Sequence, residues 1–335
     1  MTACGVHVVA APDKFKGTAS AAQVAAAISS AVRAFGATCD EVPMADGGEG
    51  TLEALGGPNR VTTVSNPLGD PVDAEWRLAK GTAVIEMARA SGLELVGGPE
   101  GNDPVNASTF GTGELVAAAL DSGAKRIIVG AGGSATTDGG LGALRAMYPL
   151  QRLRGVRLIV ACDVRTRFLD AAEVFAPQKG ATEAQVVLLR RRLESLAQTY
   201  LEEYGVDVRE LEGSGAAGGL AGGLAAAGAE LVSGFEVVAD ETRLYERMEG
   251  ADLVITGEGF VDAESFDGKV VGGVATYAAE LGIPVLAVAG QVFDGVGARV
   301  ETIDLSAIFG PDRPLREPLD CVSDAIVRWL DGRPW

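Results

Sequence analysis

The fold is indicated by residues 6–44, VHVVAAPDKFKGTASAAQVAAAISSAVRAFGATCDEVPM. The apolar run Val6–Ala11 has the length and composition of a buried strand. Ser20 is a typical N-cap residue, and Ser20–Phe35 has the apolar spacing of a helix. Thr38–Met44 then has the pattern of a second strand. This strand–helix–strand order predicts a parallel α/β sheet.

The middle of the chain has a different pattern, with short strands and tight turns. Arg60–Ser65, Val72–Leu78 and Thr82–Met87 are separated by turn residues and predict an antiparallel meander. The other predicted elements are helices at Gly113–Ser122, Glu183–Glu203 and Val322–Leu330, strands at Arg126–Gly130 and Val156–Ala161, a closely packed helix within Gly213–Gly228, and an α/β alternation through Phe235–Ala239, Ala251–Thr256, Val270–Leu281, Pro284–Ala289 and Thr302–Phe309.

Two α/β units at the ends of the chain therefore flank a middle of different character. The length of 335 residues favours two domains. We expect a parallel, doubly wound (Rossmann-like) α/β domain built from residues 1–58 and 235–335. Residues 59–234 are expected to form an inserted, mixed α/β domain.

Composition excludes several classes of partner. The 28 basic and 46 acidic residues give a net charge of −18, which repels nucleic acid and anionic membrane surfaces. No apolar stretch has the length of a membrane span, and no signal peptide is expected. The cysteines Cys4, Cys39, Cys162 and Cys321 are scattered without a Cys-x-x-Cys pair, which is typical of the reducing cytoplasm.

Histidine usage limits the chemistry. His7 is the only histidine, and it lies in the first apolar run, where a packed strand residue is the simpler interpretation. A Ser-His-Asp site or a multi-histidine metal centre is therefore not expected. Asp, Glu or Lys must carry any acid–base catalysis.

Two acidic, glycine-rich segments follow apolar strands. The first is Pro43–Thr51, PMADGGEGT, with Asp46 and Glu49 among glycines. The second is Thr256–Gly259, TGEG, followed by Asp262 and by Gly268-Lys269. Glycine permits close approach to a ligand, and carboxylates can bind Mg²⁺ or accept a proton. Two tight turns would be the structural alternative, but both segments together predict one site built from both ends of the chain.

Three further segments have the composition of ligand-binding loops. Ala11–Gly17 places Asp13, Lys14 and Lys16 directly after the first strand, where parallel sheets bind ligands, although solvated loop charges would look the same. Gly130–Gly140, GAGGSATTDGG, offers backbone N–H groups to an anion.

The third segment begins at Cys162-Asp163, where the predicted strand Val156–Ala161 ends. Asp163 follows that strand and is a candidate base or metal ligand. Lys179, in the loop Pro177–Gly180, is a candidate phosphate contact.

One motif raises a different class of enzyme. Gly213–Gly218 matches G-x-G-x-x-G, the NAD-binding fingerprint, but the preceding residues are polar and charged rather than a buried strand. A Walker A motif is absent, since Gly268-Lys269 is followed by Val270 and lacks the upstream glycine. A P-loop nucleotide site is therefore excluded.

Taken together, eight ordered motifs resemble those of the type I glycerate kinase family. They are APDKFKG, PMADGGEGT, GTGELV, GGSATTDGG, ACDV, PQKGAT, GAAGGL and DLVITGEG followed by Asp262 and Gly268-Lys269, spanning roughly Val8 to Gln291. The resemblance implies ATP- and Mg²⁺-dependent phosphorylation of D-glycerate to 2-phosphoglycerate and ADP. It also implies a two-domain α/β fold with the active site in the cleft between the domains. The chain departs from the family pattern at Thr137, Arg165, Phe260 and Glu264.

The motifs that carry the resemblance also supply the candidate site residues. The candidate catalytic residues are Asp163, Lys16 and Asp46. The candidate substrate- or nucleotide-binding residues are Asp13, Lys14, Gly47, Gly48, Glu49, Gly132, Gly133, Ser134, Asp138, Lys179, Gly215, Gly218, Glu258 and Asp262. The candidate Mg²⁺ ligands are Asp163 and Glu258. Asp46, Glu49, Asp163 and Glu258 are expected to divide metal binding and proton abstraction among them.

The expected partners are small molecules, glycerate and ATP, without nucleic acid or membrane, and a homo-oligomer stays open. A kinase for a related small hydroxy acid and a 3-phosphoglycerate-forming glycerate kinase are alternatives within the same class. An NAD-dependent oxidoreductase and a non-enzymatic small-anion-binding protein are alternatives from other classes.

Overall fold

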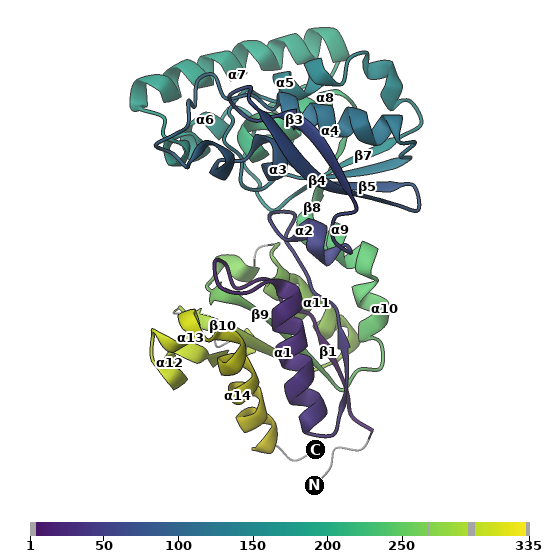
Figure 1. Cartoon of the computed structure of the whole chain (residues 1–335), viewed down its shortest axis with the longest axis vertical. Coiled ribbons are helices and arrows are strands. Elements are labelled where there is room, and N and C mark those ends of the chain that lie inside the picture. The colour runs from purple at the N-terminus through teal and green to yellow at the C-terminus, as the bar shows by residue number, and fades with distance from the viewer. Residues whose placement is uncertain (1–4, 267, 294–298, 333–335) are drawn as a thin grey trace. The chain divides into compact units, whose positions relative to one another are not determined.

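The computed structural model describes residues 5–266, 268–293 and 299–332 (Figure 1). The chain forms two compact units. Unit 1 contains Met1–Asp46, Glu53–Leu55 and Phe235–Trp335, and unit 2 contains Gly47–Leu52 and Gly56–Gly234. The chain thus passes from one unit to the other directly after Asp46, inside the first acidic segment. The domain boundaries expected from the sequence stay a prediction.

Unit 1 is a parallel sheet covered on both faces. Its strand order is β11-β10-β9-β1-β2, and every pair is parallel. The strands are β1 (His7–Ala10), β2 (Thr38–Glu41), β9 (Leu253–Val261), β10 (Val285–Val292) and β11 (Glu301–Asp304). The helices are α1 (Ala21–Ala34), α9 (Gly234–Thr242), α10 (Leu244–Met248), α11 (Val270–Leu281), α12 (Leu305–Phe309), α13 (Arg313–Arg316) and α14 (Pro318–Asp331), with α2 (Thr51–Ala54) at the crossing between the units.

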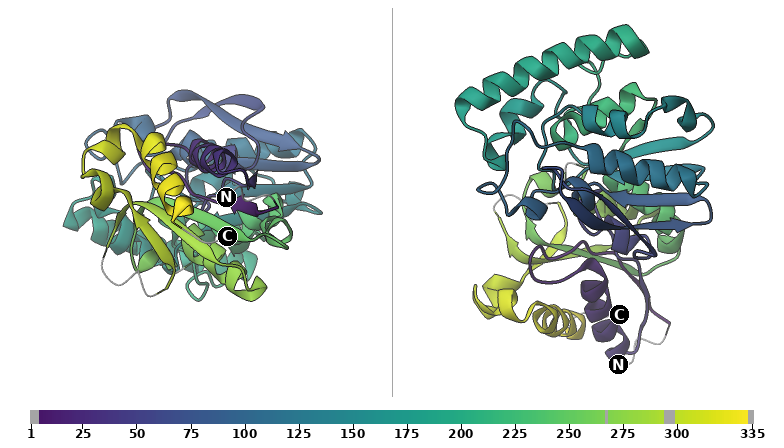
Figure 2. Two further views of the ribbon diagram at one scale, coloured as in Figure 1. Left: turned by 90° about the horizontal axis from the view of Figure 1, so that it is seen from below. Right: turned by 45° about the horizontal axis from the view of Figure 1, so that its top comes forward.

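Alternate residues of β1, an interior strand of this sheet, face two separate cores. Val8 packs in the core that α1 and α14 cover, and these helices lie side by side (Figures 1 and 2). Val9 packs in the core that includes residues of α9 and α11. A parallel strand buried on both faces needs a continuous apolar run, which explains the sequence Val6–Ala11. The predicted doubly wound sheet is confirmed.

Helix α1 begins where the sequence predicts. Ser20 Oγ accepts the Gln23 N–H at 3.2 Å, and Gln23 Oε1 accepts the Ser20 N–H at 2.9 Å. This reciprocal capping box satisfies two of the free backbone donors at the helix start.

Unit 2 contains a mixed sheet of order β3-β4-β5-β6-β7-β8. The strands β3 (Arg60–Ser65), β4 (Pro71–Ala79) and β5 (Thr82–Glu86) are antiparallel, which confirms the predicted meander. The strands β6 (Arg126–Gly130), β7 (Arg157–Cys162) and β8 (Glu230–Ser233) continue the sheet from β5 in parallel. The helices are α3 (Ala88–Ser91), α4 (Phe110–Asp121), α5 (Leu141–Ala146), α6 (Ala171–Phe175), α7 (Glu183–Tyr204) and α8 (Leu220–Ala226), and the short 3₁₀ turns include Pro177–Lys179 and Ala216–Gly219.

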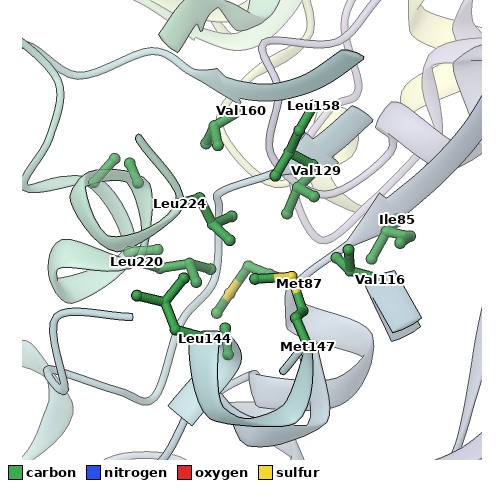
Figure 3. Close-up of a cluster of buried hydrophobic side chains, with 14 of the residues drawn as sticks. Ile85, Met87, Val116, Val129, Leu144, Met147, Leu158, Val160, Leu220 and Leu224 are labelled. Atoms are coloured by element: carbon green, nitrogen blue, oxygen red, sulfur yellow. The ribbon is translucent and has the colours of Figure 1, made fainter. Parts of the chain in front are cut away.

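The core of unit 2 forms between this sheet and its helices (Figure 3). Val129 and Val160 of neighbouring strands lie in one cluster with Leu144 and Leu224 of α5 and α8, and Ile85 of β5 belongs to the same cluster. All five side chains are buried. The core therefore fixes the carboxyl ends of β5, β6 and β7, from which the candidate loops extend.

The second acidic segment is not a loop, contrary to the sequence interpretation. Strand β9 continues through it to Val261, and Glu258 is paired with Ala289 of β10. A Cβ atom on Gly257 would overlap the carbonyl oxygen of Val288. The glycine that suggested a turn instead permits two strands to approach closely.

The predicted helix within Gly213–Gly228 is also only partly correct. It begins at Leu220, because Ala217 and Gly218 adopt left-handed backbone conformations with φ of 52° and 68°.

We predict that Gly257→Ala lowers the stability of unit 1 by about 1–3 kcal/mol, because the added methyl group forces β9 and β10 apart. Urea unfolding measured by circular dichroism tests this. Gly332→Ala is the matched control, since the nearest atom to its added Cβ is 3.7 Å away and its φ is −83°. Equal stability of the two variants would contradict the prediction.

Candidate active site

In unit 2, two of the predicted loops meet at the carboxyl ends of β6 and β7. A Cβ on Gly130 would lie 2.7 Å from the Gly47 carbonyl oxygen, and one on Gly132 would lie 2.6 Å from the Gly48 Cα. Gly47 has φ of 89°, and its own Cβ would lie 2.8 Å from the Ala161 carbonyl oxygen. Backbones can pack this closely only where side chains are missing. The structure thus brings the predicted residues Gly47, Gly48 and Gly132 together.

Glu86, which the sequence analysis does not single out, fixes the first of these loops. It ends β5, is 3% exposed, and its Oε1 accepts the N–H groups of Gly50 and Leu52, both at 2.9 Å. Its Oε2 pairs with Arg89 Nε at 3.1 Å. A buried carboxylate is stable when donors surround it in this way. In the sequence, the signal for this role is that a glutamate ends an apolar strand.

The small-residue loop 130–140 is held by main-chain bonds and by Lys179. The N–H of Leu93 donates to the Gly133 carbonyl at 3.0 Å, and the N–H of Ala135 donates to the Ser91 carbonyl at 3.0 Å. Lys179 Nζ donates to Ser134 Oγ at 2.7 Å and to the Thr136 carbonyl at 2.6 Å. The Lys179 side chain is buried in unit 2, and burial lowers its pKa to about 7, against the raising effect of Asp138.

Asp138 is bonded to the protein on both oxygens. It accepts the Thr109 N–H at 2.9 Å, the Thr109 hydroxyl at 2.8 Å, and the N–H groups of Gly140 and Gly142 at 3.0 and 3.1 Å. The carboxylate therefore joins the start of α4 to the start of α5. Its predicted contact with a ligand stays a prediction.

The remaining candidates of unit 2 lie after β7 and in the segment 213–218. Asp163 follows the last residue of β7. Gly215 donates its N–H to the Thr166 carbonyl at 2.9 Å, and a Cβ on Gly218 would overlap the Thr136 carbonyl. The glycines of the G-x-G-x-x-G match thus serve backbone packing. The residues directly before them, 208–212, form turns rather than the strand that NAD binding requires.

In unit 1, Asp13 follows β1, Asp46 follows β2, and Glu258 lies within β9. Asp13 is 6% exposed, its backbone N–H donates to the Gly257 carbonyl at 2.8 Å, and its Oδ1 accepts the Lys14 N–H at 2.6 Å. Burial, and then the negative charges of Asp46 and Glu258, raise the pKa of Asp13 to about 7, although Lys14 opposes the shift.

Burial also raises the pKa of Glu258; a Ser265 hydrogen bond and Lys269 oppose the shift, and Asp46 and Asp262 add smaller raising contributions. Among the described residues, no hydrogen-bond partner lies near its buried Oε1. Asp262 caps a short turn, since its Oδ1 accepts the Ser265 N–H at 3.0 Å. Lys16 is exposed. The raised pKa values of Asp13 and Glu258 favour a bound cation nearby.

Two departures from the family pattern are solvent-exposed. Arg165 Nε lies 3.4 Å from Glu212 Oε1, and such an exposed pair contributes little stability. Phe260 is 52% exposed, and its ring centroid lies 6.2 Å from that of Phe293.

The comparisons with known proteins cover nearly the whole chain. A family model described as "Glycerate kinase family" matches residues 8–148 and 149–324. The chain belongs to this glycerate kinase family. The glycerate 2-kinase of Escherichia coli K12 is 41% identical over 344 residues, with 91% of this chain and 90% of the relative covered. The glycerate kinase of Halalkalibacterium halodurans is 42% identical over 334 residues, with 88% of each covered.

A solved structure agrees in fold. A crystal structure described as "putative glycerate kinase 2 from Salmonella typhimurium LT2" superimposes with a TM-score of 0.82 at 36% identity, with 97% of this chain and 96% of that chain covered. The family resemblance, the α/β fold with its two sheets and the kinase activity class are thereby confirmed. None of the helices in residues 5–266, 268–293 and 299–332 is long and apolar enough to cross a membrane.

We predict that Asp13→Asn stabilises unit 1 increasingly as the pH rises from about 4 to 7. A raised folded-state pKa means that the folded protein binds more protons than the unfolded chain between about pH 4 and 7, so the wild type loses stability across that window. The upper limit is on the order of 4 kcal/mol, since one pKa unit corresponds to about 1.4 kcal/mol. Urea unfolding in EDTA at several pH values measures the difference. The exposed Asp40→Asn is the control, and a pH-independent difference for Asp13→Asn would refute the prediction.

We predict that Glu86→Ala destabilises unit 2 by about 3–5 kcal/mol, because it leaves two backbone N–H groups and Arg89 without their buried acceptor. Glu86→Gln should cost less, because its amide oxygen can still accept from Gly50 and Leu52. Chemical unfolding of both variants tests this order, with the exposed Glu100→Ala as control. If Glu86→Ala matches that control, Glu86 does not fix the loop.

Proposed function

We propose that this kinase transfers the γ-phosphoryl group of ATP to D-glycerate, with Mg²⁺, and forms 2-phosphoglycerate and ADP. The observation that carries the proposal is the relative named glycerate 2-kinase, 41% identical over 91% of this chain. The candidate loops support it, because they follow the carboxyl ends of parallel strands, where α/β sheets bind their ligands.

The predicted residues suit the charges of this reaction. Both substrates are anions and the chain carries a net charge of −18, so positive groups must be concentrated locally. In unit 1 we assign this role to Lys14 and Lys16. In unit 2 we assign it to the backbone N–H groups of Gly132–Ser134, next to Gly47–Glu49. Asp163 and Asp46 are our candidates for accepting the proton of the substrate hydroxyl.

The carboxylates of unit 1 are compatible with Mg²⁺. Glu258 has an oxygen without a hydrogen-bond partner among the described residues, and Asp13 and Glu258 both resist ionisation. In the described part of the chain, no three His, Cys, Asp or Glu side chains lie close enough to hold a metal ion by themselves. Mg²⁺ commonly keeps few protein ligands and completes its shell with water and phosphate. Glu258 is the ligand that unit 1 would contribute, and the ion, when bound, neutralises charge on the phosphates.

The 2-hydroxyl is the proposed acceptor because it adjoins the carboxylate. A site that anchors the carboxylate constrains this hydroxyl more than the distal one, which favours its alignment with the phosphoryl group. Attack by the 3-hydroxyl, or on a related hydroxy acid, is the alternative.

Coupled enzyme assays test the function. D-glycerate should stimulate ADP formation from MgATP, and enolase should convert the product without added phosphoglycerate mutase. A signal that requires the mutase would indicate 3-phosphoglycerate. No glycerate-dependent ADP formation would refute the proposal, and a screen of other small hydroxy acids would then be the next step.

We predict that Asp163→Asn lowers kcat by about 10²–10⁴, the usual cost of losing a general base, without lowering the thermal midpoint. Steady-state kinetics and thermal unfolding measure the two effects. The control is Asp170→Asn, which removes a half-exposed carboxylate from the same unit. Near wild-type turnover in Asp163→Asn would remove this residue from the mechanism and leave Asp46 as the candidate base.

A further inference from the structure

Lys179 is a buried cation whose bonds all lie inside unit 2. Its side chain is only 2% exposed, and its ammonium group donates to Ser134 and to the Thr136 carbonyl, both in the small-residue loop. No ion pair to Lys179 occurs among residues 5–266, 268–293 and 299–332 of the structure. Burying an ammonium group without a paired carboxylate costs free energy of folding. We therefore expect Lys179 to have a function that offsets this cost.

The backbone around Lys179 is fixed to the same loop. Asn102 Nδ2 donates to the Lys179 carbonyl at 2.9 Å and to the Ala135 carbonyl at 3.0 Å. Gly180 has φ of 93°, and a Cβ there would overlap the Pro99 carbonyl oxygen. The segment PQKG therefore has a physical explanation. A 3₁₀ turn directs the lysine inward, and the glycine lets the chain pass tightly behind it.

The bond to Lys179 also determines what Ser134 can do. Ser134 Oγ accepts from the ammonium group, so its own hydroxyl hydrogen remains to be donated. No protein acceptor for that hydrogen is found in the described part of the chain. A hydroxyl that accepts from a cation becomes a stronger donor. Ser134 is 8% exposed and lies in the loop whose backbone approaches Gly48 through Gly132.

We propose that Lys179 is a positioning residue that acts through Ser134. It holds the loop 132–136 and directs the Ser134 hydroxyl to an anionic oxygen of a substrate, without itself contacting the substrate. This inference rests on the proposed function for the identity of the anion, a carboxylate or phosphate oxygen. It differs from the sequence-based expectation that Lys179 contacts phosphate directly.

A double-mutant cycle distinguishes these two roles. The variants are Ser134→Ala, Lys179→Met and the double variant, and kcat and KM are measured for both MgATP and D-glycerate. Each single variant should lower kcat/KM for the same substrate by about ten- to a hundredfold, the usual effect of losing a charge-assisted bond. Since Lys179 acts through Ser134, the double variant should be no worse than the poorer single variant. Losses that multiply, or that fall on different substrates, would show that Lys179 contacts the substrate independently and would overturn the inference.

A second measurement does not depend on activity. Hydrogen exchange of the free protein should show faster exchange of the amides of residues 131–137 in Lys179→Met than in the wild type. The exposed Lys125→Met removes an equal charge from the same unit and should leave this exchange unchanged. If Lys179→Met does not fold, Lys179→Leu, which also removes the donor, replaces it in both experiments. If the exchange is unchanged, the loop-holding role is refuted, even if the protein phosphorylates glycerate. If the exchange is faster but glycerate is not phosphorylated, only the proposed function is refuted.

Discussion

The candidate site of unit 2 depends on the close packing of bare backbone at the carboxyl ends of its parallel strands. Gly47, Gly130 and Gly132 bring the chain segments after Asp46 and after β6 to within ordinary contact, and a methyl group at any of them would collide with main-chain atoms. Because these segments present backbone N–H groups rather than side chains, they can accommodate an anion where the chain is otherwise strongly acidic. The buried Glu86 and Lys179 then fix one segment each.

Glu86 and Lys179 illustrate two ways of stabilising a buried charge. Glu86 is surrounded by two backbone N–H groups and Arg89, so its negative charge is compensated by donors on every side. Lys179 has two oxygen acceptors but no paired carboxylate among the described residues, and burial lowers its pKa. The first arrangement is a stable anchor. The second leaves positive charge directly behind a loop that is expected to face an anion.

The carboxylates of unit 1 differ from Lys179, because they concentrate negative rather than positive charge. Burial and the negative charges of Asp46 and Glu258 raise the pKa of Asp13, and burial raises that of Glu258, although Lys14 opposes the first shift and Ser265 and Lys269 oppose the second. Such accumulated negative charge is characteristic of sites that are completed by a cation. Unit 1 thus offers acidic groups, the half-buried Lys14 and the exposed Lys16, whereas unit 2 offers backbone donors and a buried cation. Both sets belong to the motifs of the glycerate kinase family.

The sequence by itself determined the parallel sheet of unit 1, the antiparallel meander of unit 2, the capping of α1 and the family, because apolar periodicity, capping residues and ordered motifs are local properties of the chain. It did not determine that Thr256–Gly259 continues a strand, because a glycine at a turn and a glycine between two close strands have the same local signature. Nor could it find Glu86, place Lys179 in the interior or assign Asp138 to helix starts. Those outcomes depend on which segments meet across the sheet, and only the tertiary structure brings residue 86 to residue 50, or residue 179 to residue 134.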